Sequence, residues 1–199
     1  MHALDFIHLD VKTENVLITL QGQCKLADFG SSVRLRRPED GGGPPPPALL
    51  GEIVGTPEIM APEVVRKQQV CEVADWWSYG CVLFETLTGT SPFFDAADHT
   101  DDVLPLVARI LRGTFTIPDA LALSGEVVDL MRSLITRDTF LRLGARPHGR
   151  LAVAGHAWFD GTMTVPGGAQ PEVQADLPHA FVDAELPTGE ALIDTLLAL

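Results

Sequence analysis

A short segment near the amino terminus carries side chains whose types and spacing suit the transfer of a phosphoryl group. Asp10 is followed by Lys12 and then by Asn15, and a second carboxylate, Asp28, lies a short distance further along the chain. A carboxylate at Asp10 can accept or orient a hydroxyl proton, and the Lys12 ammonium can neutralise charge on a moving phosphoryl group. Asn15 and Asp28 offer the hard oxygen ligands that Mg²⁺ prefers. These residues predict a phosphoryl-transfer site.

Two short strands are expected to bring these residues together. Residues 16–19 and 24–27 have strand character and are joined by Gln-Gly-Gln at 21–23, which is typical of a turn. Adjacent strands lie roughly 5 Å apart, so polar groups flanking such a hairpin can share a metal ion. Residues 1–7 are expected to form the last turns of a helix, with Leu4 and Ile7 on one face.

Helical patterns dominate the remainder of the chain. Residues 75–88 are apolar almost all round, which predicts a buried central helix that stops at Gly89. Two further stretches have apolar residues at helical spacing, and Ser124 is a candidate N-cap for the second. We interpret both stripes as core packing; they comprise Val103, Leu106, Val107, Ile110 and Leu111, and Val127, Leu130, Met131, Leu134 and Ile135.

Three segments have loop-like composition. Residues 31–51 are expected to form a long loop, in which Pro44–Pro47 either bind an SH3- or WW-type module or form a solvated insertion. Residues 137–155 are expected to be rich in loops, ahead of aromatic anchors at residues 156–159. Residues 161–187 are rich in Pro, Gly and acidic residues and predict an extended tail, after which Thr188 could cap a short closing helix.

The overall composition predicts one globular domain. The 199 residues carry a formal net charge of −13, which argues against nucleic-acid binding because phosphate backbones require a basic face. The most apolar stretch, residues 76–87, is too short to span a bilayer. Residues 1–5 lack the basic start and apolar core of a secretory signal. The scattered Cys24, Cys71 and Cys81 favour reduced thiols and a cytoplasmic location.

Taken together, these motifs resemble the C-terminal lobe of a eukaryotic protein kinase. His-Leu-Asp at 8–10 stands where the family has His-Arg-Asp, Asn15 ends the catalytic loop, Asp-Phe-Gly occupies 28–30, and Ala-Pro-Glu occupies 61–63. The resemblance covers residues 1–159. It implies a mainly α lobe with a short β-hairpin at the cleft, and a tail at residues 160–199 like that of the AGC group.

The resemblance also extends to the group. A Lys two residues after the catalytic Asp, together with Gly-Thr-Pro-Glu at 55–58, is similar to serine/threonine kinases rather than tyrosine kinases. Residues 28–32 and 77–80 resemble the branch of myotonic dystrophy kinase, Rho-kinase and citron kinase, which implies a cytoskeletal role. The segments that resemble the AGC group are residues 75–78, 91–94, 142–144 and 156–159.

The resemblance assigns catalytic and cofactor roles to the matched positions. Asp10 would be the catalytic base or hydroxyl-orienting group, and Lys12 would contact the transferred phosphate of ATP. Asn15 and Asp28 would hold Mg²⁺. Thr56 would hydrogen-bond the pair formed by Asp10 and Lys12 and help to favour a Ser or Thr hydroxyl as acceptor. The segment that contacts ATP would also include Glu14 and Leu17.

The resemblance assigns structural roles to a second set. Glu63 would pair with Arg142, and Asp75 would support the catalytic loop. The remaining structural positions are His8, Phe29 and Gly30.

Two acids are candidates for substrate recognition. Glu14 and Glu85 fall where AGC kinases bind arginines on the N-terminal side of the phosphorylation site, which predicts a preference for basic protein substrates. The alternative is that both are ordinary surface acids.

Several positions depart from the family pattern. Leu9 replaces the arginine that binds a phosphorylated activation loop, Glu52 stands at the phosphothreonine position, and Val33 stands where a lysine often completes the basic pocket. We therefore expect activity that does not require phosphorylation of this loop.

A further departure is that no Gly-rich ATP loop, strand lysine or helix glutamate precedes His8. We expect the N-terminal lobe to be absent and the chain alone to be essentially inactive. Two hypotheses follow: part of an active Ser/Thr kinase, or a truncated product or non-catalytic lobe that binds partners.

Overall fold

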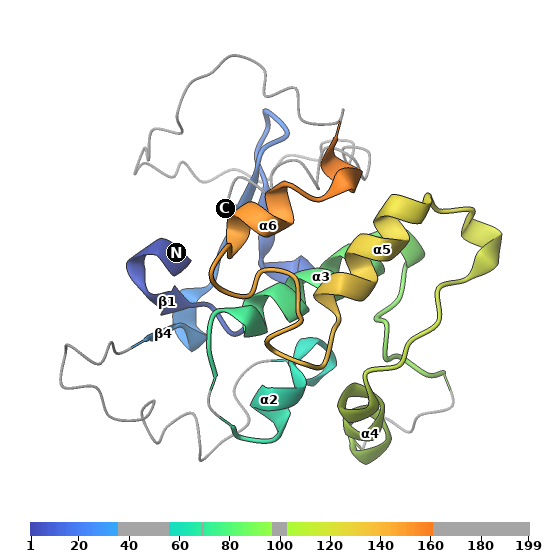
Figure 1. Ribbon diagram of the computed structural model, residues 1–199, viewed down its shortest axis with the longest axis horizontal. Helices are drawn as coiled ribbons and strands as arrows, with labels where there is room; N and C mark the ends of the chain where they lie inside the picture. Colours follow the sequence, from blue (N-terminus) through green and yellow to red (C-terminus); the bar gives the residue numbers. More distant parts are fainter. Residues whose placement is uncertain (36–55, 69, 97–102, 161–199) are drawn as a thin grey trace.

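Helices form most of the regular structure around one core. A computed structural model describes residues 1–35, 56–68, 70–96 and 103–160. Within these ranges the helix α3 (Val73–Thr88) occupies the centre, and the other helices surround it (Figure 1). They are α2 (Pro62–Val65), α4 (Leu104–Arg112), α5 (Gly125–Leu134) and α6 (Arg150–Ala154). This arrangement agrees with the predicted mainly α architecture.

The helix α3 is buried along most of its length, as its apolar composition predicts. It begins at Val73, two residues before the predicted start, and eleven of its sixteen residues are buried. Gly89 ends it in the left-handed conformation (φ 83°) and donates its N–H to Glu85 O at 2.8 Å. The absence of a side chain at Gly80 allows α5 to approach, because a Cβ there would lie 2.8 Å from Leu134 Cβ.

The core surrounds α3 and includes buried residues from segments before and after this helix. The Trp77 ring stacks on Phe93, with ring centroids 5.5 Å apart, and Phe93 in turn meets Phe115 edge-on. From α5, Leu130, Met131 and Leu134 are fully buried in the same core. The N-cap prediction for this helix is confirmed, because the Ser124 side chain accepts a hydrogen bond from Val127 N.

The predicted hairpin is present. The strands β2 (Val16–Ile18) and β3 (Cys24–Leu26) pair antiparallel, with Leu17 opposite Lys25. The hairpin is flanked by two 3₁₀ turns, η2 (Thr13–Asn15) and η3 (Phe29–Ser31).

The expected helix over residues 1–7 is wrong. Only a 3₁₀ turn, η1 (His2–Leu4), forms there, and Asp5 then turns the chain with φ 61°. The strand β1 (Phe6–Ile7) follows and pairs with β4 (Val33–Arg34), so the segment expected to be a loop from residue 31 contains a short strand (Figure 1). Local periodicity could not anticipate this pairing, because its two partners are far apart in the sequence.

One more expectation needs correction. Core packing is wrong for part of the α4 stripe, since Ile110 is buried but Val103, the N-cap residue before the helix, is 49% exposed. The stretch expected to be rich in loops has turns and bends over residues 137–149 and then the short helix α6, which precedes the 3₁₀ turn η7 (Ala157–Phe159). The remaining 3₁₀ turns are η5 (Pro57–Ile59) and η6 (Asp119–Leu121). Pro44–Pro47, Glu52 and the tail at residues 161–199 lie outside the described residues.

Candidate active site

The loop that carries Asp10 is attached to the central helix through Asp75. The two carboxylate oxygens of this buried residue accept hydrogen bonds from His8 N at 2.8 Å and Leu9 N at 2.9 Å. The ring of His2 contacts the same carboxylate at 2.6 Å. Leu9 adopts a left-handed conformation (φ 66°), which is unusual for a residue with a branched side chain. The Asp75 contacts hold this turn in place, as predicted for a residue that supports the loop.

The buried His8 ring links this loop to the hairpin. Its Nε2 lies 3.1 Å from Ala27 O, and its Nδ1 accepts a hydrogen bond from Asp10 N at 3.3 Å. This arrangement places the proton on Nε2. The Phe29 ring packs against His8, with ring centroids 5.1 Å apart. His8 therefore connects Ala27, the residue before Asp28, to the loop that carries Asp10.

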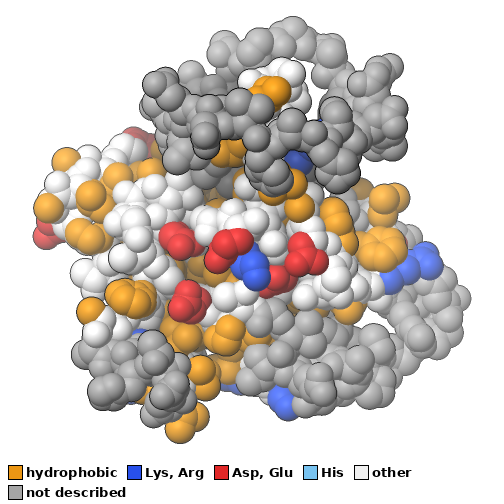
Figure 2. Space-filling view, turned by 180° about the vertical axis from the view of Figure 1, so that it is seen from behind, with side chains coloured by type: hydrophobic (Ala, Val, Ile, Leu, Met, Phe, Trp, Pro, Cys, Tyr) orange, Lys and Arg blue, Asp and Glu red, His pale blue; other side chains and the backbone are white. Residues whose placement is uncertain are grey.

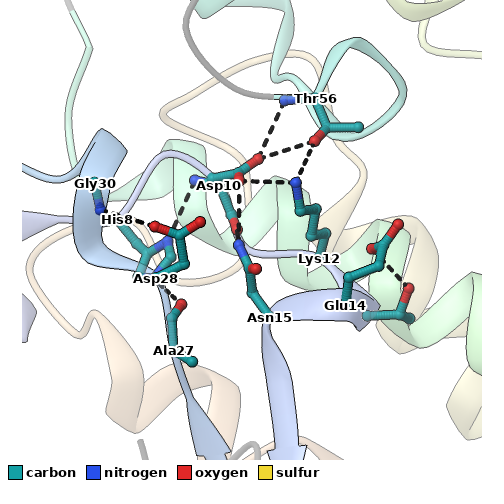
Figure 3. A network of polar contacts seen from close by, with 10 residues as sticks. His8, Asp10, Lys12, Glu14, Asn15, Ala27, Asp28, Gly30 and Thr56 are labelled. Atoms are coloured by element: carbon teal, nitrogen blue, oxygen red, sulfur yellow. Dashed lines mark hydrogen bonds and ion pairs between the residues drawn. The ribbon is translucent and has the colours of Figure 1, made fainter.

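Asp10 is the centre of a polar network, which Figure 3 shows from close by. Its Oδ1 accepts two hydrogen bonds from Thr56, one from the backbone N and one from Oγ1, both at 3.1 Å. Its Oδ2 forms an ion pair with Lys12 Nζ at 3.0 Å, and Lys12 also donates to Thr56 Oγ1 at 2.9 Å. The predicted contact of Thr56 with both residues is present.

The network shifts the pKa values of Asp10 and Lys12. Burial by itself raises the pKa of Asp10, but the hydrogen bonds and charge of Lys12 and the hydrogen bonds of Thr56 outweigh it and leave the pKa below its ordinary value. The hydrogen bond with Asp10 raises the pKa of Lys12. At neutral pH Asp10 is therefore an ionised acceptor and Lys12 a cation.

Asn15 and Asp28 present oxygen ligands at the same end of the hairpin (Figure 3). Asn15 donates its amide group to Asp10 O at 2.8 Å and to Asp10 Oδ2 at 3.1 Å, so its oxygen is left for another ligand. Asp28 adopts a left-handed conformation (φ 58°) and accepts a hydrogen bond from Gly30 N at 3.1 Å. A Cβ at Gly30 would lie 3.1 Å from the same oxygen, so a larger residue there would crowd the carboxylate. This donor set fits a hard cation whose remaining ligands come from phosphate or water.

A buried ion pair fixes the segment that follows Thr56. Arg142 donates to both carboxylate oxygens of Glu63, at 2.6 and 2.9 Å, as predicted. It also donates to Val73 O and Thr136 O, and its guanidinium lies 5.1 Å from the centre of the Trp77 ring. These contacts join α2, α3 and the segment after α5, so the pair is part of the fold.

Comparison with known proteins decides the family. A model of the protein kinase domain matches residues 1–159 of the chain. The chain is 36% identical over 159 residues to the cAMP-dependent protein kinase catalytic subunit of Dictyostelium discoideum, covering 80% of this chain and 22% of that protein. It is 32% identical over 188 residues to the serine/threonine-protein kinase Sgk2 of Rattus norvegicus, covering 90% and 47%. The chain belongs to the protein kinase family.

The relatives of this kinase chain also define its group. Ribosomal protein S6 kinase alpha-3 of Homo sapiens is 36% identical over 159 residues, covering 80% of this chain and 20% of that protein. All three relatives are AGC-family kinases. The chain spans less than half the length of each of these curated relatives.

The two acids predicted to recognise substrate lie close together in this kinase chain. Thr13 Oγ1 is 3.2 Å from Glu14 Oε2 and 3.2 Å from Glu85 Oε2. Glu14 is exposed, whereas Glu85, on α3, is partly buried. Burial raises the pKa of Glu85; the Thr13 hydrogen bond opposes this effect, and the charges of Glu14 and Glu58 add to it. Figure 2 shows acidic side chains gathered around a basic one on one face of the molecule.

Two exposed apolar residues of the kinase chain lie close in sequence to Asn15 and Asp28. Leu17, predicted to contact ATP, is 44% exposed on β2, and Phe29 is 57% exposed despite its contact with His8.

No helix within the described ranges is long and apolar enough to cross a membrane. In the described part of the chain, Cys24, Cys71 and Cys81 form no disulfide.

Sequence reasoning missed two residues with polar contacts in and beside the candidate active site, His2 and Thr13. His2 contacts Asp75, and Thr13 contacts both candidate substrate acids. Thr13 could have been identified from its position between Lys12 and Glu14. The sequence held no comparable signal for His2, because its partner lies 73 residues away.

Proposed function

We propose that residues 1–159 are the C-terminal lobe of a Ser/Thr kinase that transfers a phosphoryl group from ATP to protein hydroxyls. The observation that carries the proposal is the contact of Asp10 with both Lys12 and Thr56. It supports an ionised Asp10 that accepts or orients the proton of the substrate hydroxyl. Lys12 is then placed to balance negative charge beside that hydroxyl. Thr56 keeps both side chains in these orientations.

Asn15 and Asp28 would hold Mg²⁺ in this proposal. Their donor oxygens suit that ion, which when bound neutralises charge on the phosphates of ATP. Asn15 donates its amide N–H groups to Asp10, so the Asn15 amide oxygen is directed away from Asp10.

A second, ATP-binding lobe would cover two exposed apolar residues of the chain. Leu17 and Phe29 are large, exposed apolar side chains; Leu17 follows Asn15 by two residues and Phe29 follows Asp28 directly. An adenine ring or a facing lobe would remove them from water. This lobe, whether from the same longer protein or from another chain, is the partner that we expect for catalysis.

The preferred substrates would be proteins with basic residues before the phosphorylated Ser or Thr. Glu14 and Glu85 support this preference, because their adjacent carboxylates match an arginine guanidinium. A kinship with the citron and Rho-kinase branch, a cytoskeletal role and a cytoplasmic location are further parts of the proposal. They rest on the motifs at residues 28–32 and 77–80 and on the scattered cysteines.

The test is a phosphorylation assay on two forms of the protein. The longest native reading frame that contains residues 1–199 should phosphorylate a basic serine peptide, and its Asp10→Asn variant should lose most of that activity. The 199-residue chain should give no single turnover. Equal activity of the wild-type and Asp10→Asn reading frames would overturn the proposal and favour a non-catalytic binding lobe.

A further inference from the structure

The Thr13 hydroxyl lies between two carboxylates that come from distant parts of the sequence. Glu14 belongs to the 3₁₀ turn after the catalytic loop, and Glu85 lies on α3, 72 residues from Thr13. Each carboxylate places its Oε2 atom 3.2 Å from the same Thr13 oxygen. One side chain thus lies within hydrogen-bond distance of both acids.

A single hydroxyl has only one proton to donate. Thr13 therefore cannot fully satisfy two carboxylates, and each acid keeps further lone pairs for another donor. Among the described residues, neither Oε1 atom is engaged in a hydrogen bond. A ligand with several donors in one plane would complete both acids, and a guanidinium has this geometry.

The electrostatic surroundings also favour a cationic ligand. Lys12, the cation next to Thr13 in the sequence, pairs with Asp10. Burial raises the pKa of Glu85, the Thr13 hydrogen bond lowers it, and the charges of Glu14 and Glu58 raise it again. Thr13 thus favours the ionised form of Glu85, whereas burial and the charges of Glu14 and Glu58 disfavour that form.

We propose that Thr13 is a positioning residue for substrate specificity, whose hydroxyl holds Glu14 and Glu85 as one site for a single substrate arginine. The inference rests on the proposed preference for basic substrates. It adds that this preference depends on a hydroxyl that need not itself touch the substrate.

The experiment measures peptide binding by the full 199-residue chain, so it does not depend on turnover. Fluorescein-labelled peptides carry one serine and one arginine at successive positions before it, and matched peptides carry neutral citrulline instead. The wild type should prefer one arginine peptide over its citrulline counterpart. Thr13→Val should reduce that preference roughly fivefold, the size of one hydrogen bond of about 1 kcal/mol. Thr13→Ser, which keeps the hydroxyl, should retain it within about twofold.

Thr86→Val is the matched control. Thr86 follows Glu85 directly in α3, and its hydroxyl donates a hydrogen bond to Val82 O. Removing this hydroxyl should leave the arginine preference unchanged. Circular dichroism checks that each variant is folded, and Thr13→Ala gives a second test of the lost hydroxyl.

The outcomes separate the inference from the proposed function. If the wild type binds both peptides equally, the preference for basic substrates and the role of Thr13 both fail. If Glu14→Gln and Glu85→Gln abolish the preference but Thr13→Val keeps it, only the role of Thr13 fails. An equal loss of affinity for both peptides in Thr13→Val would also overturn the inference, because it would indicate a general structural effect.

Discussion

Thr56 donates two hydrogen bonds to one carboxylate oxygen of Asp10, from its backbone N–H and from its hydroxyl, although the residues are 46 positions apart. The same hydroxyl accepts a hydrogen bond from Lys12. The loop that carries the candidate base and the segment before Pro57 are therefore joined at one atom. Burial raises the pKa of Asp10, and this contact acts together with Lys12 to lower it.

Thr56→Val should raise the pKa of Asp10 while leaving its backbone contact in place. Burial raises this pKa, the hydrogen bonds of Lys12 and Thr56 lower it below its ordinary value, and valine removes one of them. A carbon-13 NMR titration of the Asp10 carboxyl group measures the change. Thr86→Val removes a hydroxyl that donates to Val82 O instead of to Asp10, and it should leave the titration unaltered. An identical Asp10 pKa in the wild type and Thr56→Val would refute the prediction.

The same shift has a consequence for stability at low pH. Because the folded-state pKa of Asp10 lies below its unfolded value, its ionised form stabilises the fold above the unfolded pKa. This contribution disappears as the pH falls through the folded-state pKa. Urea unfolding between neutral and acid pH should therefore show a smaller acid-dependent loss in Thr56→Val than in the wild type.

Breaking the buried pair of Glu63 and Arg142 should destabilise the protein strongly. Glu63→Gln leaves a guanidinium whose side chain is fully buried without its charged partner, at a cost of roughly 3–5 kcal/mol. Arg146→Met is the comparison, because it removes a guanidinium that is 72% exposed and leaves a Glu72 side chain that is 12% exposed. Its loss of stability should be smaller than that of Glu63→Gln, since water already solvates the Arg146 charge. Urea unfolding measures both variants. Equal losses in the two would contradict the prediction.

Asp75→Asn should loosen the loop that carries Asp10. An asparagine keeps one acceptor oxygen, so His8 N or Leu9 N loses its partner, and a buried unsatisfied donor costs about 1–3 kcal/mol. Hydrogen exchange followed by NMR should show faster exchange at these two amides. Asp129→Asn is a suitable control, because Asp129 also contacts a histidine, His156, but its side chain is 73% exposed. Unchanged exchange in Asp75→Asn would count against this role.

Activity of the native reading frame should survive phosphatase treatment. The Leu9 side chain is 7% exposed within the core, and Val33 lies in β4, so neither position supplies a cation for a phosphate. Phosphorylation assays before and after treatment should agree within about twofold, since no charge-assisted contact is lost. A large loss that maps to a phosphorylated residue between Ser31 and Thr56 would show that the prediction is wrong.

The sequence by itself determined the family, the hairpin and the central helix. Each depends on neighbours in the chain: the motif around Asp10, the two short strands flanking residues 21–23, and the apolar composition that ends at Gly89. Such patterns are local, because strand alternation and helix termination need only a few consecutive residues. The pairing of Glu63 with Arg142 was accessible through the family resemblance alone.

Only the tertiary structure decided the contacts between segments far apart in the chain. The pairing of β1 with β4 overrode the helical appearance of residues 1–7, because strand pairing depends on a partner that local periodicity does not contain. The contact of Thr13 with Glu85 likewise requires α3 to pass beside the segment that follows Asp10. Local sequence motifs therefore identify the side chains of the site. The distances between these side chains, and the pKa shifts that those distances cause, follow from packing around the central helix.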